Sequence, residues 1–115
     1  MRIDWDKVNI YIRTGYTDMR KQINTLAILV RQDCGKDPLD GSLYIFCGSG
    51  RRTLKALYWE KNGFCLWMKR LNEDKFPWPL KESSVRQITS EEMKMILSGI
   101  DFFLAHQEKK YEILA

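Results

Sequence analysis

The sequence predicts an α+β fold, in which an antiparallel β meander forms a sheet with a long helix packed on one face and a second helix near the C-terminus. Three patterns indicate this fold. Strand-like runs follow one another in the middle of the chain, an apolar stripe with helical spacing precedes them, and a capping motif opens a second stripe after them. The 115 residues suffice for one domain with one core. We therefore expect a single domain over residues 1–101 and a C-terminal tail over residues 102–115, either helical or flexible.

The N-terminal part of the chain is expected to form a strand and then a helix. Residues 8–12 alternate apolar and polar side chains, which favours a strand. A helix is predicted near residues 18–33, with Thr17 or Asp18 at its N-cap, because a short side-chain oxygen can accept hydrogen bonds from the first-turn amides. The apolar face of this helix consists of Met19, Ile23, Leu26, Ala27 and Val30.

The middle of the chain predicts three antiparallel strands, over residues 43–47, 54–59 and 64–69. The last two are joined by Asn62-Gly63, a pair that favours a type I′ turn because both central residues of that turn need positive φ. With this turn, Trp59 faces Leu66, and Tyr58 faces Trp67.

Alternation along this hairpin sorts its side chains into two faces. The first face is apolar, is expected to lie against the helix, and consists of Leu57, Trp59, Phe64, Leu66 and Met68. The second is expected to be solvated and consists of Ala56, Tyr58, Glu60, Cys65, Trp67 and Lys69. We expect burial of Trp59, Leu66, Ile23 and Val30.

The last part of the domain is expected to contain an extended segment, a short strand and a helix. Prolines in Phe76-Pro77-Trp78-Pro79 disfavour a central strand. Residues 85–88 suggest a short strand. Thr89 and Glu92 form a capping box, which predicts a helix near residues 90–98.

Composition argues against several classes of protein. No apolar run approaches the roughly 20 residues that span a bilayer, and the N-terminus lacks the apolar stretch of a signal peptide, so we expect a cytoplasmic protein without membrane partners. Cys34, Cys47 and Cys65 are widely spaced, and the single histidine, His106, is far from them, so we expect no metal site and no cofactor. Scattered acidic residues and a histidine without a nucleophile partner predict no catalytic residues and no enzymatic activity.

Charge and aromatic content leave two kinds of partner open. The net charge is +4, and the positive excess lies within residues 1–80. The Gly48–Arg52 segment is interpreted either as a basic hairpin tip that contacts a nucleic-acid backbone or as a solvated turn. Tyr58, Trp67 and Trp78 suggest a docking or base-stacking surface, unless Trp67 instead packs under residues 76–79 as a satellite core.

Several motifs, in order and at matching separations, resemble one family over roughly residues 8–101. The matching segments are Thr17-Asp18-Met19-Arg20-Lys21, Asp37-Pro38-x-x-Gly41-x-Leu43-Tyr44-x-Phe46, Leu54-Lys55-x-Leu57-Tyr58-Trp59, Gly63-Phe64-Cys65-Leu66-Trp67-x-Lys69-Arg70-Leu71 and Phe76-x-Trp78-Pro79. In these segments the chain is similar to the TnpB-type accessory proteins of insertion sequence 66 transposons. It departs from their usual pattern at Gln22, where they carry Gly, and at the hairpin tip.

The resemblance implies a non-catalytic accessory protein that assists DNA transposition beside a separate transposase, which carries the nuclease chemistry. Expected partners are DNA, as transposon ends or target, together with the transposase and other transposon-encoded proteins; the oligomeric state is left open. By resemblance, the residues expected to bind nucleic acid are Arg20, Lys21, Lys55, Lys69 and Arg70. The positive charge of the hairpin tip adds Arg51 and Arg52 to this set. In the alternative, the protein docks the transposase without contacting DNA, and the partner-binding residues are Tyr58, Trp67 and Trp78.

Overall fold

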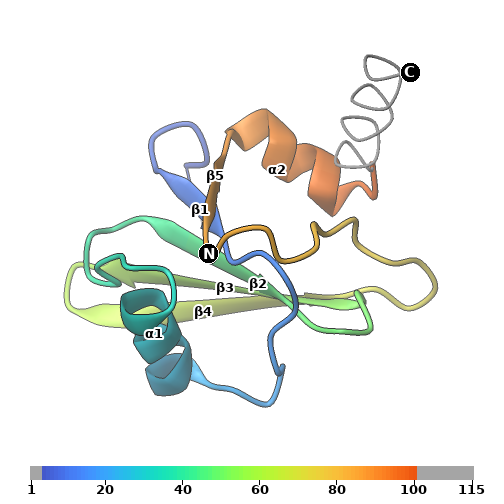
Figure 1. Cartoon of the computed structure of the whole chain (residues 1–115). Coiled ribbons are helices and arrows are strands. Elements are labelled where there is room, and N and C mark those ends of the chain that lie inside the picture. Colours follow the sequence, from blue (N-terminus) through green and yellow to red (C-terminus); the bar gives the residue numbers. More distant parts are fainter. Residues whose placement is uncertain (1–3, 101–115) are drawn as a thin grey trace, which may run out of the picture.

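The computed structural model describes residues 4–100, which form a five-stranded mixed sheet with one helix on each face (Figure 1). The strand order across the sheet is β4-β3-β2-β1-β5. Neither helix in residues 4–100 is long and apolar enough to cross a membrane. In chain order the elements are β1 (Ile10–Ile12), α1 (Ile23–Gln32), β2 (Leu43–Cys47), β3 (Thr53–Glu60), β4 (Gly63–Arg70), β5 (Arg86–Ile88) and α2 (Ser90–Leu97).

The predicted meander is confirmed, but the sheet as a whole is not purely antiparallel. Strands β2, β3 and β4 pair antiparallel in sequence order. Strand β1 lies parallel to β2, and β5 is antiparallel to β1 on its other side. The physical reason is that α1 lies between β1 and β2 in the chain, and such a crossover connection brings the next strand back in the same direction.

The predicted hairpin register is wrong, because the two-residue turn lies one residue earlier in the chain than expected. The turn is formed by Lys61 and Asn62, with Lys61 at φ 55°, and Gly63 already pairs with Glu60. Trp59 therefore lies opposite Phe64, and their rings meet edge to face with centroids 5.0 Å apart. Such a cross-strand aromatic pair stabilises this register. The shift moves each partner by two residues, so the predicted division of side chains between the two faces is unaffected.

Helix α1 is shorter than predicted. It begins at Ile23 and has ten residues, so a long helix is not confirmed. Its N-cap is Gln22, without a side-chain hydrogen bond, because Asp18 instead accepts a hydrogen bond from the backbone N–H of Arg20 in a local turn. Leu26 and Val30 are fully buried and pack on the sheet.

The sheet face under α1, which we call the α1 face, is only partly covered. Val30 is buried as expected, but Trp59, Leu66 and Ile23 are half-buried. Met68, further along β4, is 58% exposed. A helix of ten residues is too short to cover the full length of the β3–β4 hairpin.

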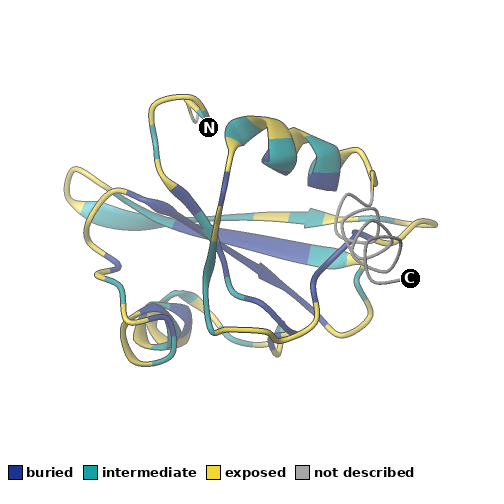
Figure 2. Cartoon of the chain, turned by 45° about the horizontal axis from the view of Figure 1, so that its top comes forward, coloured by how far each residue is buried: buried dark blue, intermediate teal, exposed yellow. Residues whose placement is uncertain are grey.

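The opposite face, which we call the α2 face, carries the larger core and is not simply solvated as expected. Figure 2 shows that the buried residues are concentrated in the strands of the sheet. Leu54 and Ala56 of β3 are fully buried there, beneath α2 and the segment containing Phe76 and Trp78. Tyr58 and Trp67 are half-buried and pack against the same cluster. The sequence patterns predicted that a helix packs on only one face of the sheet, whereas in the structure residues pack on both faces.

The C-terminal elements match their predictions. Strand β5 and helix α2 lie where they were expected, and the capping box is formed. The Thr89 backbone N–H donates to Glu92 Oε1 at 3.0 Å, and the Glu92 N–H donates to Thr89 Oγ1 at 3.1 Å. The predicted tail, residues 102–115, lies outside the described residues.

Candidate nucleic-acid interface

One end of the sheet brings together basic residues from the meander. Strand β2 ends there, β3 begins there, and β4 ends there, so the loop at residues 48–52 lies beside the chain that leaves β4. The backbone N–H of Leu71 donates to the carbonyl of Arg52 at 2.8 Å, and Arg70 pairs with Thr53. Arg51, Arg52 and Arg70 therefore share one end of the sheet.

A second segment, residues 13–21, is attached to the same end. The backbone N–H of Thr17 donates to the Cys47 carbonyl at 2.8 Å, so the contact of this segment with β2 continues past β1 to the last residue of β2. As a result, Arg20 and Lys21 lie across from the hairpin tip. We call the set Arg20, Lys21, Arg51, Arg52 and Arg70 the basic end of the protein.

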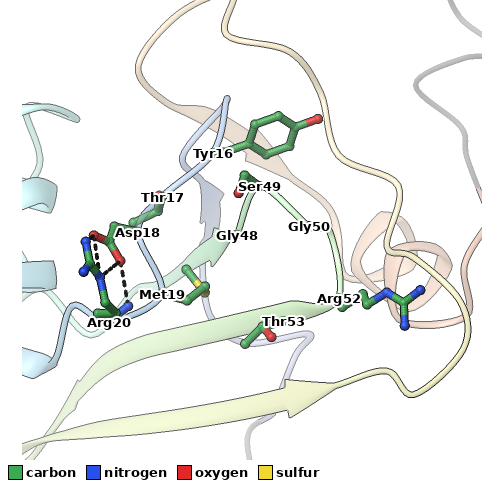
Figure 3. Close-up of a pocket in the computed structure, with 10 residues that line it drawn as sticks. All are labelled: Tyr16, Thr17, Asp18, Met19, Arg20, Gly48, Ser49, Gly50, Arg52 and Thr53. Carbon is green, nitrogen blue, oxygen red and sulfur yellow. Dashed lines mark hydrogen bonds and ion pairs between the residues drawn. The ribbon is translucent and has the colours of Figure 1, made fainter.

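Between the two segments lies a hollow of about 520 Å³, lined by residues 16–20 and by residues 48–50, 52 and 53 (Figure 3). Its walls are polar and apolar in about equal parts, with hydroxyls from Thr17, Ser49 and Thr53 and apolar surface from residues such as Met19. Figure 3 shows Arg52 directed away from the hollow and Arg20 folded back on Asp18. The charges of Arg20 and Arg52 are therefore carried on the rim of the hollow and not inside it.

Asp18 and Arg20 form a bidentate ion pair on this rim. Arg20 Nη2 donates to Asp18 Oδ2 at 2.7 Å, and Arg20 Nε donates to Oδ1 at 3.0 Å. The side-chain hydrogen bonds from Arg20 hold the pKa of Asp18 well below its usual range. The Arg20 side chain is 91% exposed, and an exposed ion pair contributes little to stability, so an incoming phosphate can compete with Asp18 for this guanidinium.

The hollow depends on a glycine. A Cβ on Gly48 would lie 2.6 Å from Met19 Cγ, closer than real Cβ contacts allow. The absence of a side chain at residue 48 thus lets the Met19 segment approach the end of β2.

We expect Gly48→Ala to lower the free energy of unfolding by about 1–3 kcal/mol, because the new methyl group overpacks against Met19. Gly50→Ala is the matched control, since nothing lies within 4 Å of a Cβ at that position, and we expect a change within about 0.5 kcal/mol. Urea unfolding of both variants measures the difference. Equal stability of the two would show that Gly48 does not set this approach.

Lys55, one of the expected nucleic-acid-binding residues, is buried. It is 4% exposed on the α1 face, and its Nζ donates to the Lys21 carbonyl at 2.8 Å. A phosphate cannot reach it in this fold. Its contact instead fixes the segment that carries Arg20 and Lys21 to the sheet, which makes it a positioning residue for the basic end.

Lys69 lies at the same end of the sheet as Arg70 but on the opposite face, because side chains alternate along β4. It pairs with Leu54, is half-buried and lies on the α2 face, whereas Arg70 lies on the α1 face beside Thr53. Of the seven expected cationic residues, the structure thus brings five together and sets Lys55 and Lys69 apart.

The three aromatic residues expected to bind a partner do not form an open surface. Trp78 is 6% exposed, and its indole N–H donates to the carbonyls of Gly15 at 2.7 Å and Arg13 at 3.1 Å. Tyr58 and Trp67 are half-buried against the core of the α2 face. Their arrangement matches the alternative interpretation, in which Trp67 belongs to a core formed with residues 76–79.

Two further lysines near the basic end were not singled out from the sequence. Lys81 lies beside Gly15, and Lys75 lies in the chain that follows β4; both are exposed. No local pattern marks them, because only the tertiary fold brings them to this end. Glu73 and Asp74 lie in the same chain after β4 and reduce the net charge there.

The opposite end of the sheet has no positive excess. The acidic residues there, Asp37, Asp40 and Glu60, are matched in number by Arg31, which pairs with Asp37, by Lys36, which lies over the Tyr11 ring, and by Lys61. Among the described residues the positive excess therefore lies towards the basic end. Such a field orients an anionic partner towards that end.

The described residues contain no group of three or more histidine, cysteine, aspartate or glutamate side chains that could hold a metal ion. His106 lies outside them. Cys34 and Cys47 are buried, and burial raises the pKa of the Cys47 thiol to about 12. These thiols are therefore poor nucleophiles and poor metal ligands at neutral pH.

Comparison with known proteins identifies one family and two relatives of similar length. Residues 8–107 match the family described as IS66 Orf2 like protein, TnpB_IS66. The uncharacterized protein y4hO of Sinorhizobium fredii is 38% identical over 95 residues, which is 83% of each chain. The uncharacterized protein y4jC of the same organism is 27% identical over 95 residues, which is 83% of this chain and 81% of the relative. No solved structure matches the chain.

Proposed function

The chain belongs to the IS66 Orf2-like family of transposon-associated accessory proteins, and from that membership we propose that it assists transposition by binding DNA through the basic end of its sheet. The family is not a known catalytic one and is associated with the transposition machinery in general. The proposal specifies what the protein binds, the phosphate backbone of DNA, and which residues bind it.

One observation carries the proposal. Basic residues from segments far apart in the sequence, represented by Arg20, Arg52 and Arg70, lie at the same end of the sheet. Arginine suits phosphate because its guanidinium is planar, is always charged and can donate two parallel hydrogen bonds. Arg20, Arg52 and Arg70 are exposed to solvent.

The expected contact is electrostatic and independent of DNA sequence. Within residues 4–100 the basic end offers phosphate-binding cations but no exposed helix that could enter a major groove, since α1 and α2 pack on the sheet. Neutralising Z phosphates gives a slope of about −0.9Z for log affinity against log salt concentration, so five cations set a limit of about −4.5. Binding of this kind is weak at physiological salt.

The proposal is tested by titrating the protein against a duplex with the transposon-end sequence and against a random duplex, at about 50 and 200 mM salt. We expect similar affinities for the two duplexes and a fall of up to several hundred-fold between the two salt concentrations. No binding to either duplex at the lower salt concentration would contradict the proposal.

The alternative, transposase docking through Tyr58, Trp67 and Trp78, receives less support from the packing. The hydrogen bonds of Trp78 are satisfied within the protein, and the other two side chains rest on the core. A hot spot needs a side chain that is free to enter a pocket of the partner. We therefore do not propose these aromatic residues as the main partner-binding surface.

A further inference from the structure

The two edges of the sheet differ in length and protection. Strand β5 forms one edge with three residues and carries Arg86 and Gln87. Strand β4 forms the other edge with eight residues, and no element of residues 4–100 pairs with its outer side (Figure 1). An unpaired edge of this length presents a row of backbone N–H and C=O groups that another strand can bind.

Protective features are absent from most of this edge. Residues 63–68 contain no proline and no charged side chain, and the pairing of β4 with β3 is continuous, without a bulge. Charges occur only in the last two residues, Lys69 and Arg70. Natural edges usually carry such features along their length, so the β4 edge has the properties of an interface.

The order of side chains along β4 is self-complementary. When two copies pair antiparallel about an axis through Leu66, Leu66 lies opposite itself, and Phe64 lies opposite Met68 of the other copy. These residues all lie on the α1 face, where Phe64 and Leu66 are only half-buried and Met68 is exposed. The pairing therefore covers apolar surface that α1 leaves open, and it gains Met–Phe contacts.

Charge complementarity supports the same register. On the α2 face, Glu60 of β3 lies beside Gly63 of β4, and this register places Lys69 of the other copy on the far side of Gly63. The two Cα atoms are then two strand spacings apart, about 10 Å, and Gly63 has no side chain to separate the charged groups. Glu60 Oε2 already extends over β4 and lies 3.8 Å from Cys65 Sγ. The pair forms twice in a symmetric dimer.

We propose that two copies of the chain pair antiparallel through β4, about a two-fold axis at Leu66, and so join their sheets into one continuous sheet. The seam consists of backbone hydrogen bonds, the Phe64–Met68 and Leu66–Leu66 contacts on the α1 face, and the Glu60–Lys69 pairs on the α2 face. This assigns Lys69, which the fold places on the opposite face from Arg70, to the dimer seam.

Disulfide cross-linking tests the register. In a Cys65→Ser background, Leu66→Cys places two thiols directly opposite each other, at the 4.5–5.5 Å Cα separation of antiparallel pairs, which suits a disulfide. Met68→Cys is the control, because the two residues 68 are about 14 Å apart in this register. Cys34 and Cys47 are buried and do not interfere. Under mild oxidation without DNA, we expect at least a tenfold excess of cross-linked dimer for Leu66→Cys over the control.

Sedimentation provides a second measurement that leaves the apolar seam intact. We expect Glu60→Lys and Lys69→Glu each to raise the dimer dissociation constant about tenfold, and the double exchange to restore it. A wild-type chain that stays monomeric up to about 100 μM, a concentration well above those at which stable dimers form, would overturn the proposal. Equal cross-linking at residues 66 and 68 would also overturn it. Because DNA is absent, either result is independent of the proposed DNA contact.

Discussion

Replacing Trp78 by alanine is expected to lower the free energy of unfolding by about 3–5 kcal/mol, a large part of the stability of a domain of this size. The side chain is 6% exposed and belongs to the core of the α2 face together with Phe76. Its loss leaves a cavity and also two buried carbonyls, of Arg13 and Gly15, without their indole donor.

Trp78→Phe separates these two effects. It keeps a six-membered aromatic ring in the core and removes the N–H with the rest of the five-membered ring, so we expect a smaller loss of about 1–3 kcal/mol. Urea unfolding measures both variants, and the phenylalanine variant remains informative if the alanine variant does not fold. Little change in either variant would mean that Trp78 is available at the surface, as the partner-docking alternative requires.

The combined variant Arg51→Gln, Arg52→Gln and Arg70→Gln is expected to bind duplex DNA about 10²- to 10³-fold more weakly than the wild type at about 50 mM salt. Each residue contributes one phosphate contact at the rim of the basic end, and the loss follows from the counterions that are no longer released. The three side chains reach solvent, so we expect the fold to be retained.

The matched control for this variant is Lys61→Asn at the far end of the same hairpin. Lys61 has φ 55°, a conformation that asparagine tolerates, so the control removes one charge without straining the turn. We expect its DNA affinity to change less than about twofold. A comparable loss per charge in both variants would indicate a response to net charge alone, without a localised interface.

Local sequence patterns predicted the parts of the fold that depend on near neighbours. The capping box of Thr89 and Glu92 involves residues three apart, and the two faces of the β3–β4 hairpin follow from alternation. The start of α1 was misplaced because Asp18 has an equally local alternative, a turn that binds Arg20.

The features that were missed all depend on contacts between distant segments. Lys55 is buried because the Lys21 carbonyl, thirty-four residues away in sequence, accepts its hydrogen bond. Trp78 is buried because Arg13 and Gly15 lie over it, more than sixty residues away. Neither partner can be identified from residue type or spacing, so both side chains were assigned to a binding surface. The gathering of Arg20 with Arg52 and Arg70 equally requires the tertiary fold.

The central claim is that the basic end of the sheet binds the DNA backbone, and the salt dependence of duplex affinity tests it most directly. Log affinity is measured against log salt concentration for the wild type and for the variant that lacks the charges of Arg51, Arg52 and Arg70. The account predicts that the variant's slope is shallower by about 2.7, since each lost phosphate contact removes about 0.9. Identical slopes for the two proteins would contradict it.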